Sequence, residues 1–154
     1  MLIVDDDPRT RDALAAYLSL LDGIGVVLQA SDGWEAIDLV QTQPTDIVLM
    51  DIRMPRLDGV EATRIVKTVW PATKVIILSM YPEYRSAALE IGADAFLVKG
   101  RRAEDLVSTI RSLAPSHEGS ANTTRLMAAS KRPSASATWC CSASAQAQMS
   151  AWSR

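Results

Sequence analysis

Four short apolar runs in this sequence each end at a side chain that can take part in a reaction. The residues that directly follow these runs are Asp5-Asp6-Asp7, Asp51, Ser79 and Lys99. The carboxyl ends of neighbouring parallel strands meet at one edge of a sheet, where open α/β folds place their sites. If the runs are parallel strands, the acids, the hydroxyl and the amine therefore lie at the same edge. Packing gives little reason for a carboxylate at Asp51, the exit of a buried strand.

Strand-like and helix-like segments alternate along residues 1–114. The predicted strands are Met1–Asp5, Val26–Gln29, Asp46–Met50, Lys74–Leu78 and Ala95–Val98. The predicted helices run from Asp7-Pro8 to Asp22-Gly23, from Ser31 or Asp32 to Pro44, from Asp58-Gly59 to about Val69, from Pro82-Glu83 to Gly92, and from Arg102 to Leu113. Because the strands are apolar almost throughout, helices should cover both of their faces. The pattern predicts an α/β fold with a doubly wound, five-stranded parallel sheet.

The character of the chain changes at Pro115. Residues 1–114 contain all the predicted elements and are acidic, whereas residues 115–154 are mildly basic, rich in Ser and Ala, and without a regular period. We therefore expect one domain at 1–114 and an irregular C-terminal tail of uncertain structure at 115–154. The tail shows no helix-turn-helix pattern and few basic residues, so no direct DNA binding is expected from this chain.

The sequence also bears on the cellular compartment. No apolar run approaches the roughly 18 residues that a membrane helix needs, and no signal peptide opens the chain. The two cysteines, Cys140 and Cys141, are adjacent and form no disulfide framework. These features predict a cytoplasmic protein without a membrane partner.

The acids at the strand ends suggest a metal site. Carboxylates that lie close together repel one another, and each raises the pKa of its neighbours. A Mg²⁺ ion removes that repulsion, and it prefers carboxylate, carbonyl and water oxygens. The predicted ligands are Asp5, Asp6, Asp51 and the backbone carbonyl of Arg53, where the chain turns before Pro55.

The same residues suggest a reaction. A carboxylate held beside Mg²⁺ can attack a phosphoryl group, and the charge on the transferring group needs partners. The ammonium group of Lys99 and the hydroxyl of Ser79 are the candidate partners. The strand ends therefore predict an aspartyl-phosphate site in which Asp51 is the nucleophile.

Taken together, these segments resemble the receiver domain of bacterial two-component response regulators. The matching segments are Val4-Asp5-Asp6-Asp7, Asp51-Ile-Arg-Met-Pro-Arg-Leu-Asp58-Gly59, Leu78-Ser79 and Gly92-Ala-Asp-Ala-Phe-Leu-Val-Lys99, in order over about residues 1–114. Many receivers have proline after the lysine, whereas Gly100 follows Lys99 here, as is common in the NarL/LuxR-like subgroup. The chain resembles a receiver of that subgroup without its DNA-binding domain.

The resemblance implies a flavodoxin-like receiver fold and a role for each matching residue. These roles are phosphoacceptor for Asp51, metal binding for Asp5, Asp6, Asp51 and the Arg53 carbonyl, contact with the phosphate for Lys99, and switching for Ser79 and Phe96. The implied phosphoryl donor is a histidine kinase. Phosphorylation is expected to change self-association, with a homodimer as the hypothesis, or the binding of a partner.

Other interpretations stay open at this point. Asp51 could be a solvated strand-end acid, Lys99 a surface lysine, Ser79 an ordinary strand-end hydroxyl and Phe96 simply a core residue. A second function class is a Mg²⁺-dependent aspartyl-phosphate phosphatase of the haloacid dehalogenase type, which uses the same groups. Such phosphatases need a second acid two residues after the nucleophile, where this chain has Arg53. We therefore expect a signalling switch and not an enzyme that acts on external substrates.

Overall fold

A computed structural model describes residues 1–114, and the predicted tail at 115–154 lies outside the described residues. The described chain forms one five-stranded parallel sheet in the order β2-β1-β3-β4-β5. Its elements are β1 (Leu2–Val4), α1 (Pro8–Ser19), β2 (Leu28–Ala30), α2 (Gly33–Thr42), β3 (Ile47–Met50), α3 (Gly59–Val69), β4 (Lys74–Ser79), η1 (Pro82–Tyr84), α4 (Arg85–Glu90), β5 (Ala95–Val98) and α5 (Ala103–Leu113). The predicted doubly wound parallel sheet is confirmed.

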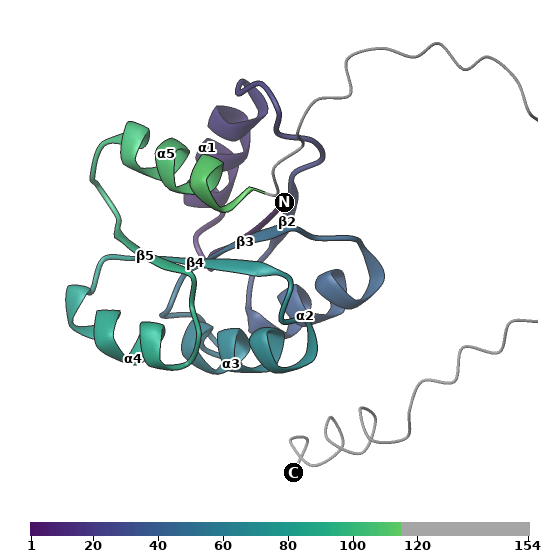
Figure 1. Ribbon diagram of the computed structural model, residues 1–154, viewed down its shortest axis with the longest axis vertical. Helices are drawn as coiled ribbons and strands as arrows, with labels where there is room; N and C mark the ends of the chain where they lie inside the picture. The colour runs from purple at the N-terminus through teal and green to yellow at the C-terminus, as the bar shows by residue number, and fades with distance from the viewer. Residues whose placement is uncertain (115–154) are drawn as a thin grey trace, which may run out of the picture. The chain divides into compact units, whose positions relative to one another are not determined.

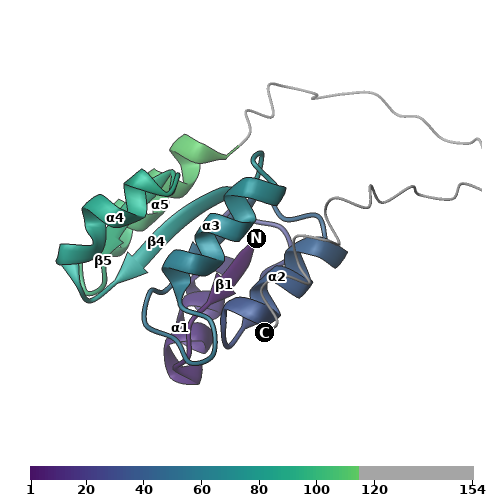
Figure 2. The ribbon, with the colours of Figure 1, turned by 90° about the horizontal axis from the view of Figure 1, so that it is seen from below.

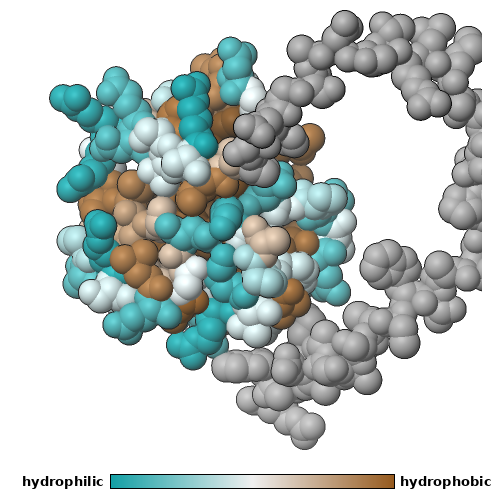
Figure 3. All heavy atoms as spheres, in the orientation of Figure 1, coloured by the Kyte–Doolittle hydropathy of each residue, from teal (hydrophilic) through white to brown (hydrophobic). Residues whose placement is uncertain are grey.

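The helices cover both faces of the sheet, as the apolar strands require. Figure 1 shows α1 and α5 on one face and α2, α3 and α4 on the other, and Figure 2 shows the second layer from its own side. Each face has its own cluster of buried apolar side chains, and the central strands contribute to both of them. On the face seen in Figure 3, hydrophobic side chains show between hydrophilic ones where the helical layers meet the sheet. The core therefore consists of two layers, separated by the sheet.

The strand register decides which residues meet at the carboxyl edge. Val4 of β1 pairs with Met50 of β3, and Met50 pairs with Ile77 of β4. The chain leaves β1 toward β2 on one side and returns to β3 on the other side of β1. The strand order reverses between β1 and β3, and open α/β sheets bind ligands at such a point. Asp5 and Asp51, one residue beyond the paired Val4 and Met50, lie there.

Three aspartates begin helices at this same edge. Asp7 accepts a hydrogen bond from the Arg9 amide at the start of α1, with Pro8 at the first helical position, as the sequence predicts. Asp32 and Asp58 cap α2 and α3 by accepting bonds from amides in their first turns. The capping carboxylates fix where each helix starts, and thereby fix the loops that surround the carboxyl edge.

Several predicted boundaries are wrong. The first helix ends at Ser19 and not at Asp22-Gly23. The second strand runs over Leu28–Ala30 and not Val26–Gln29, and Val26 is exposed although it is apolar. The segment after β4 was predicted to be one helix from Pro82-Glu83, but it starts as a 3₁₀ turn and only Arg85–Glu90 is α-helical. Neither Tyr81 nor Tyr84 provides a side-chain cap that would start an α-helix earlier.

Asp94 holds the opposite, amino-terminal end of the sheet together. Its carboxylate contacts the Lys67 and Lys74 ammonium groups, each at 3.0 Å, and accepts a hydrogen bond from the Val75 amide at 2.9 Å. Burial raises the pKa of Asp94, but the Val75 amide and the two lysines outweigh it, so the pKa lies below its ordinary value of 3.8. This cluster is part of the scaffold, away from the carboxyl edge.

We expect Asp94→Asn to lower the free energy of unfolding by about 1–3 kcal/mol at pH 7, as for other charged hydrogen bonds. Because the folded pKa is depressed, this stabilisation is present above about pH 3.8 and is lost as the pH falls through the folded pKa. Denaturant unfolding between pH 7 and pH 3 measures it, with Asp38→Asn, at an exposed carboxylate, as the control. A difference from the wild type that persists unchanged to pH 3 would contradict the assignment.

Candidate functional site

Three predicted metal ligands lie together at the carboxyl edge. Asp5 and Asp51 are buried, with 2% and 7% of their surface exposed, whereas Asp6 is exposed. One carboxylate oxygen from each of the three lies within 4.8 Å of the others. The Asp51 amide donates to the Val4 carbonyl at 2.8 Å, which continues the ladder between β1 and β3. The ladder that aligns the two strands thus also sets the spacing of their terminal acids.

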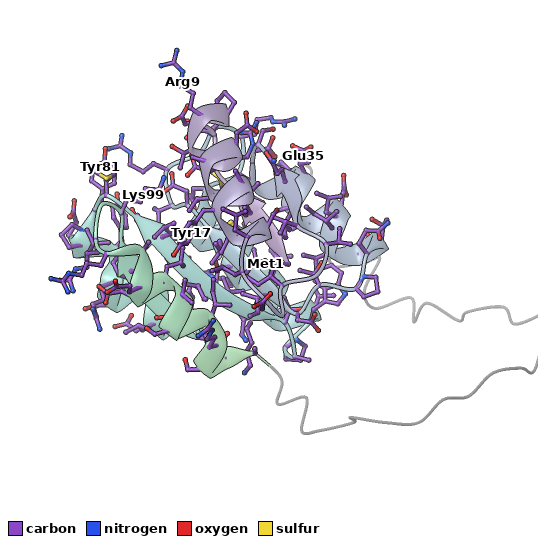
Figure 4. All side chains as sticks on the ribbon, turned by 90° about the horizontal axis from the view of Figure 1, so that it is seen from above. Met1, Arg9, Tyr17, Glu35, Tyr81 and Lys99 are labelled. Carbon is purple, nitrogen blue, oxygen red and sulfur yellow. The ribbon has the colours of Figure 1, made fainter. Side chains whose placement is uncertain are left out.

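Lys99 joins two of these acids. Its ammonium nitrogen lies 2.6 Å from Asp5 Oδ2 and 3.2 Å from Asp51 Oδ1. The lysine follows β5, and its own amide donates to the Ser79 carbonyl at 2.9 Å. Figure 4 shows Lys99 at the carboxyl end of the sheet, near Tyr81. The ammonium group therefore lies inside the predicted site and not on the free surface.

The charges of the site are only partly balanced. Burial raises the pKa of Asp51 above its ordinary value, and the nearby Asp5 adds to this, although the contacts with Lys99 act in the opposite direction. Burial lowers the pKa of Lys99, but its contacts with Asp5 and Asp51 outweigh burial and leave it raised. One ammonium group thus faces three carboxylates. The site has the excess negative charge that a cation would neutralise.

Ser79 lies at the end of β4, one residue farther than predicted for that strand, and its side chain is fully buried. Its hydroxyl oxygen accepts a hydrogen bond from the Tyr81 amide at 3.2 Å. Since Met50 pairs with Ile77, Ser79 and Asp51 end neighbouring strands at the same edge. Contact between the Ser79 hydroxyl and a group attached to Asp51 stays a prediction.

Phe96 is not part of this cluster of polar groups. It pairs with Ile77 in the middle of β5, is 6% exposed, and belongs to the core on the side of α2, α3 and α4. The structure thus shows a buried aromatic residue, and the switch role of Phe96 stays a prediction.

Arg53 lies in the loop between β3 and α3, two residues after Asp51. Its guanidinium group stacks over the ring of Tyr81, 4.8 Å from the ring centroid, and Tyr81 in turn makes an edge contact with Tyr84. The stack connects the loop after β3 to the loop after β4. Sequence reasoning did not select Tyr81; its position two residues beyond Ser79 was the only available signal. The Arg53 carbonyl as a metal ligand stays a prediction.

The donor set suits a hard divalent cation. Mg²⁺ binds one or two carboxylates, keeps several waters and takes its remaining oxygens from carbonyls or phosphates. Within residues 1–114, the Asp6 side chain makes no hydrogen bond. Lys99 contacts Oδ1 of Asp51, so Oδ2 of Asp51 remains as a possible metal ligand. The residues present therefore fit a cation of this kind.

Known proteins resemble the chain over the same region. The model of the response regulator receiver domain matches residues 1–111. The positive alginate biosynthesis regulatory protein of Pseudomonas aeruginosa is 41% identical over 113 residues, which cover 72% of this chain and 45% of that protein. The response regulator protein VraR of Staphylococcus saprophyticus is 38% identical over 115 residues, 72% of this chain and 54% of VraR. The chain spans about half the length of the curated relatives it matches.

Solved structures agree in fold. A LuxR-family response regulator from Aurantimonas has a TM-score of 0.69 and 31% identity, covering 73% of this chain and 81% of that one. The response regulator TrrA from Thermotoga maritima, solved in complex with Mg²⁺ and a beryllium fluoride, has a TM-score of 0.68 and 30% identity, covering 73% of this chain and 96% of that one. The predicted resemblance to NarL/LuxR-like response regulators is confirmed, and the chain belongs to the response regulator receiver domain family.

Proposed function

We propose that Asp51 accepts a phosphoryl group from a phosphorylated histidine kinase, with Mg²⁺, and that the chain acts as a signalling switch. The observation that carries this proposal is the position of Asp51. This buried carboxylate shares Lys99 with Asp5, and one of its oxygens lies within 4.8 Å of oxygens of Asp5 and Asp6. Membership of the receiver family and the Mg²⁺–beryllium fluoride complex of TrrA support it.

The residues of the site divide the reaction between them. A carboxylate oxygen of Asp51 attacks phosphorus, the bond from phosphorus to the kinase imidazole breaks, and the imidazole leaves with the electron pair of that bond. Mg²⁺, when bound by Asp5, Asp6 and Asp51, would neutralise charge on the phosphoryl oxygens. Lys99 supplies a second positive charge, and the buried Ser79 hydroxyl can donate to an oxygen of the attached group.

A kinase needs access to this edge, and a groove beside Lys99 is the candidate docking surface. A groove of about 560 Å³ runs between α1 and the segment that joins β5 to α5, and Lys99 is among its lining residues. Apolar side chains such as Leu14 line the floor, while Arg9 and Arg101 contribute positive charge. We propose that a kinase contacts this groove, which Lys99 connects to the acidic cluster.

The output of the switch is also part of the proposal. We infer that the phosphoryl group pulls the side chains of Ser79 and Phe96 inward and thereby changes the conformation of the surface formed by α4, β5 and α5. The result would be altered self-association or partner binding. Exposed apolar side chains on this side, such as Met80 and Leu89, fit a contact surface. We do not propose direct DNA binding by this chain, and the homodimer stays a prediction, as does the cytoplasmic location. Within residues 1–114, no helix has the length and apolar character to cross a membrane.

The phosphatase alternative gains no support from the comparisons. Its general acid/base would stand two residues after Asp51, where Arg53 instead stacks on Tyr81. We therefore propose at most self-catalysed phosphorylation and dephosphorylation, and no turnover of external substrates.

Incubation of the full chain with acetyl phosphate and Mg²⁺ tests the proposal. We expect intact mass to show one added phosphoryl group per chain that is lost on base treatment, and EDTA to prevent its addition. Release of inorganic phosphate over many turnovers from external phosphate esters would favour the phosphatase. Absence of the adduct from the Mg²⁺-loaded chain, with acetyl phosphate in excess, would contradict the proposal.

A further inference from the structure

The loop between β3 and α3 contains an unusual turn at Arg56. Its φ is 65°, and it is the non-glycine residue with positive φ in the described chain. The Leu57 amide donates to the Pro55 carbonyl at 2.8 Å, which closes a three-residue γ-turn centred on Arg56. A residue with a side chain is strained in this conformation, so the surrounding structure must stabilise it.

The side chain of Arg56 supplies such an interaction. Its guanidinium group forms an ion pair with Oδ2 of Asp32, a carboxylate that is only 1% exposed. The other oxygen, Oδ1, caps α2 by accepting from the amides of Trp34 and Glu35, at 2.8 and 3.1 Å. No hydrogen-bond partner is recorded for Oδ2 among the described residues, so Arg56 is the group that offsets its charge. Ion pairs with an exposed arginine are ordinarily weak, but here the carboxylate is buried.

The loop is fixed to its surroundings on both sides of Arg56. On the α2 side, the Gly33 amide donates to the Leu57 carbonyl at 3.3 Å, and a Cβ on Gly33 would lie 2.8 Å from that oxygen. On the β3 side, the Gly59 amide donates to the Ile52 carbonyl at 2.8 Å. The loop that leaves Asp51 is thus pressed against the start of α2, with Arg56 at the point of contact.

We propose that Arg56 is a positioning residue for phosphoryl acceptance. Its ion pair with Asp32 holds the loop after β3 in the conformation from which the Arg53 backbone offers its carbonyl to Mg²⁺. This inference rests on the proposed function, because it assigns Arg56 to the metal site of that same reaction. It also assigns Asp32 two tasks, since one oxygen caps α2 and the other anchors the loop of the acceptor.

The sign of the effect of Arg56→Gly separates positioning from simple electrostatics. Removing a positive charge from the loop after Asp51 would, through the field alone, strengthen Mg²⁺ binding. Glycine also adopts positive φ without strain, so the loop backbone gains rather than loses local stability. Weakened Mg²⁺ binding in a folded Arg56→Gly protein would therefore indicate that the ion pair with Asp32 positions the loop.

We expect Arg56→Gly to lower the melting temperature of the metal-free protein, because the buried Asp32 carboxylate loses the group that offsets its charge. At a temperature where the variant is folded, it should bind Mg²⁺ about three- to tenfold more weakly. That range is at or below the 10- to 100-fold typical of groups that directly orient a ligand. Calorimetric titration of the full chain with MgCl₂ measures the affinity. Phosphoryl uptake from acetyl phosphate should fall at limiting Mg²⁺ and recover at saturating Mg²⁺. Arg111→Gln, on exposed α5 surface, is the control for loss of one charge and should bind Mg²⁺ like the wild type.

A double-mutant cycle tests the route through Asp32. Asparagine is also a good N-cap, so Asp32→Asn removes the ion pair and keeps the start of α2. In the Asp32→Asn background, Arg56→Gly should have little further effect on Mg²⁺ affinity. The inference would be overturned if Arg56→Gly bound Mg²⁺ as tightly as the wild type or more tightly, or if the effects of the two substitutions on Mg²⁺ affinity simply added. The proposed function would stand in that case, provided that the wild type takes up the phosphoryl group. A wild type that neither binds Mg²⁺ nor takes up the phosphoryl group would overturn both.

Discussion

Replacing Asp51 by asparagine should abolish phosphoryl uptake and at the same time stabilise the metal-free protein. Uptake is lost because the amide is a poor nucleophile toward phosphorus, whereas the carboxylate is the proposed attacking group. The loss should be complete in intact mass after incubation with acetyl phosphate and Mg²⁺. Asp38→Asn, an exposed carboxylate away from the site, should take up one phosphoryl group like the wild type.

The gain in stability follows from the charges of the site. Burial raises the pKa of Asp51 above 3.8, with Lys99 acting in the opposite direction. A carboxyl group whose folded pKa is raised stabilises the fold only at low pH, and this contribution is lost as the pH rises through the folded pKa. At pH 7 the charged Asp51 therefore opposes folding, and asparagine relieves that cost. We expect a gain of about 0.5–2 kcal/mol, the range that single stabilising substitutions commonly give.

Denaturant unfolding with and without Mg²⁺ measures this second effect. In EDTA the Asp51→Asn protein should be more stable than the wild type at pH 7, and the difference should disappear below about pH 3.8. Added Mg²⁺ should stabilise the wild type more than the variant, because the variant has one charged ligand fewer. An Asp51→Asn protein that is less stable than the wild type in EDTA would show that the Lys99 contact outweighs burial.

The sequence predicted the parts of the fold that depend on burial and strand order. The strands around Val4, Met50 and Ile77 are apolar almost throughout, and such strands are ordinarily covered on both faces. Their alternation with capped helices then leaves few possible topologies, so the residues after each strand could be expected at one edge. The boundary at Val26 was not predictable in this way, since Val26 is as apolar as the strand residues and is nevertheless exposed.

The sequence predicted which residues form the site better than it predicted the contacts between them. The pattern indicated that Asp5, Asp51 and Lys99 would meet, but the bridge from one ammonium group to both carboxylates depends on the register of β1, β3 and β5. Arg56 gave no local signal at all, because arginine has no preference for positive φ. Its turn is held by Asp32, which lies far away in the sequence, and such pairs appear only once the chain is folded.

Gly59→Ala should be the most disruptive change of a single methyl group at this edge. A Cβ on Gly59 would lie 1.8 Å from the Asp51 carbonyl oxygen and 2.8 Å from its carbon. Both are backbone atoms, so no side-chain rotation can relieve the overlap. We expect the free energy of unfolding to fall by about 3 kcal/mol, at the upper end for overpacked sites. Chemical denaturation followed by circular dichroism measures the loss.

The matched control is Gly25→Ala. No atom lies within 4 Å of a Cβ at Gly25, and its φ is not in the left-handed region. The same glycine-to-alanine change should there be neutral or stabilising by up to about 1 kcal/mol, because alanine restricts the unfolded chain. If both variants lost stability equally, the loss would come from the composition of the loop and not from the contact with Asp51.

The location of the overlap also predicts a defect in the folded variant. The Asp51 amide donates a hydrogen bond to the Val4 carbonyl at 2.8 Å, which holds one side of this residue in place. If the Asp51 carbonyl is displaced, the backbone of Asp51 must rotate, and its side chain moves with it. A misplacement of about 1 Å at a reacting group can cost on the order of 100-fold in rate. At a temperature where circular dichroism shows Gly59→Ala folded, its phosphoryl uptake should still be at least about tenfold slower than that of the wild type. Uptake at the wild-type rate would instead mean that α3 moves to absorb the strain, and that the Asp51 backbone holds its position more firmly than the first turn of the helix does.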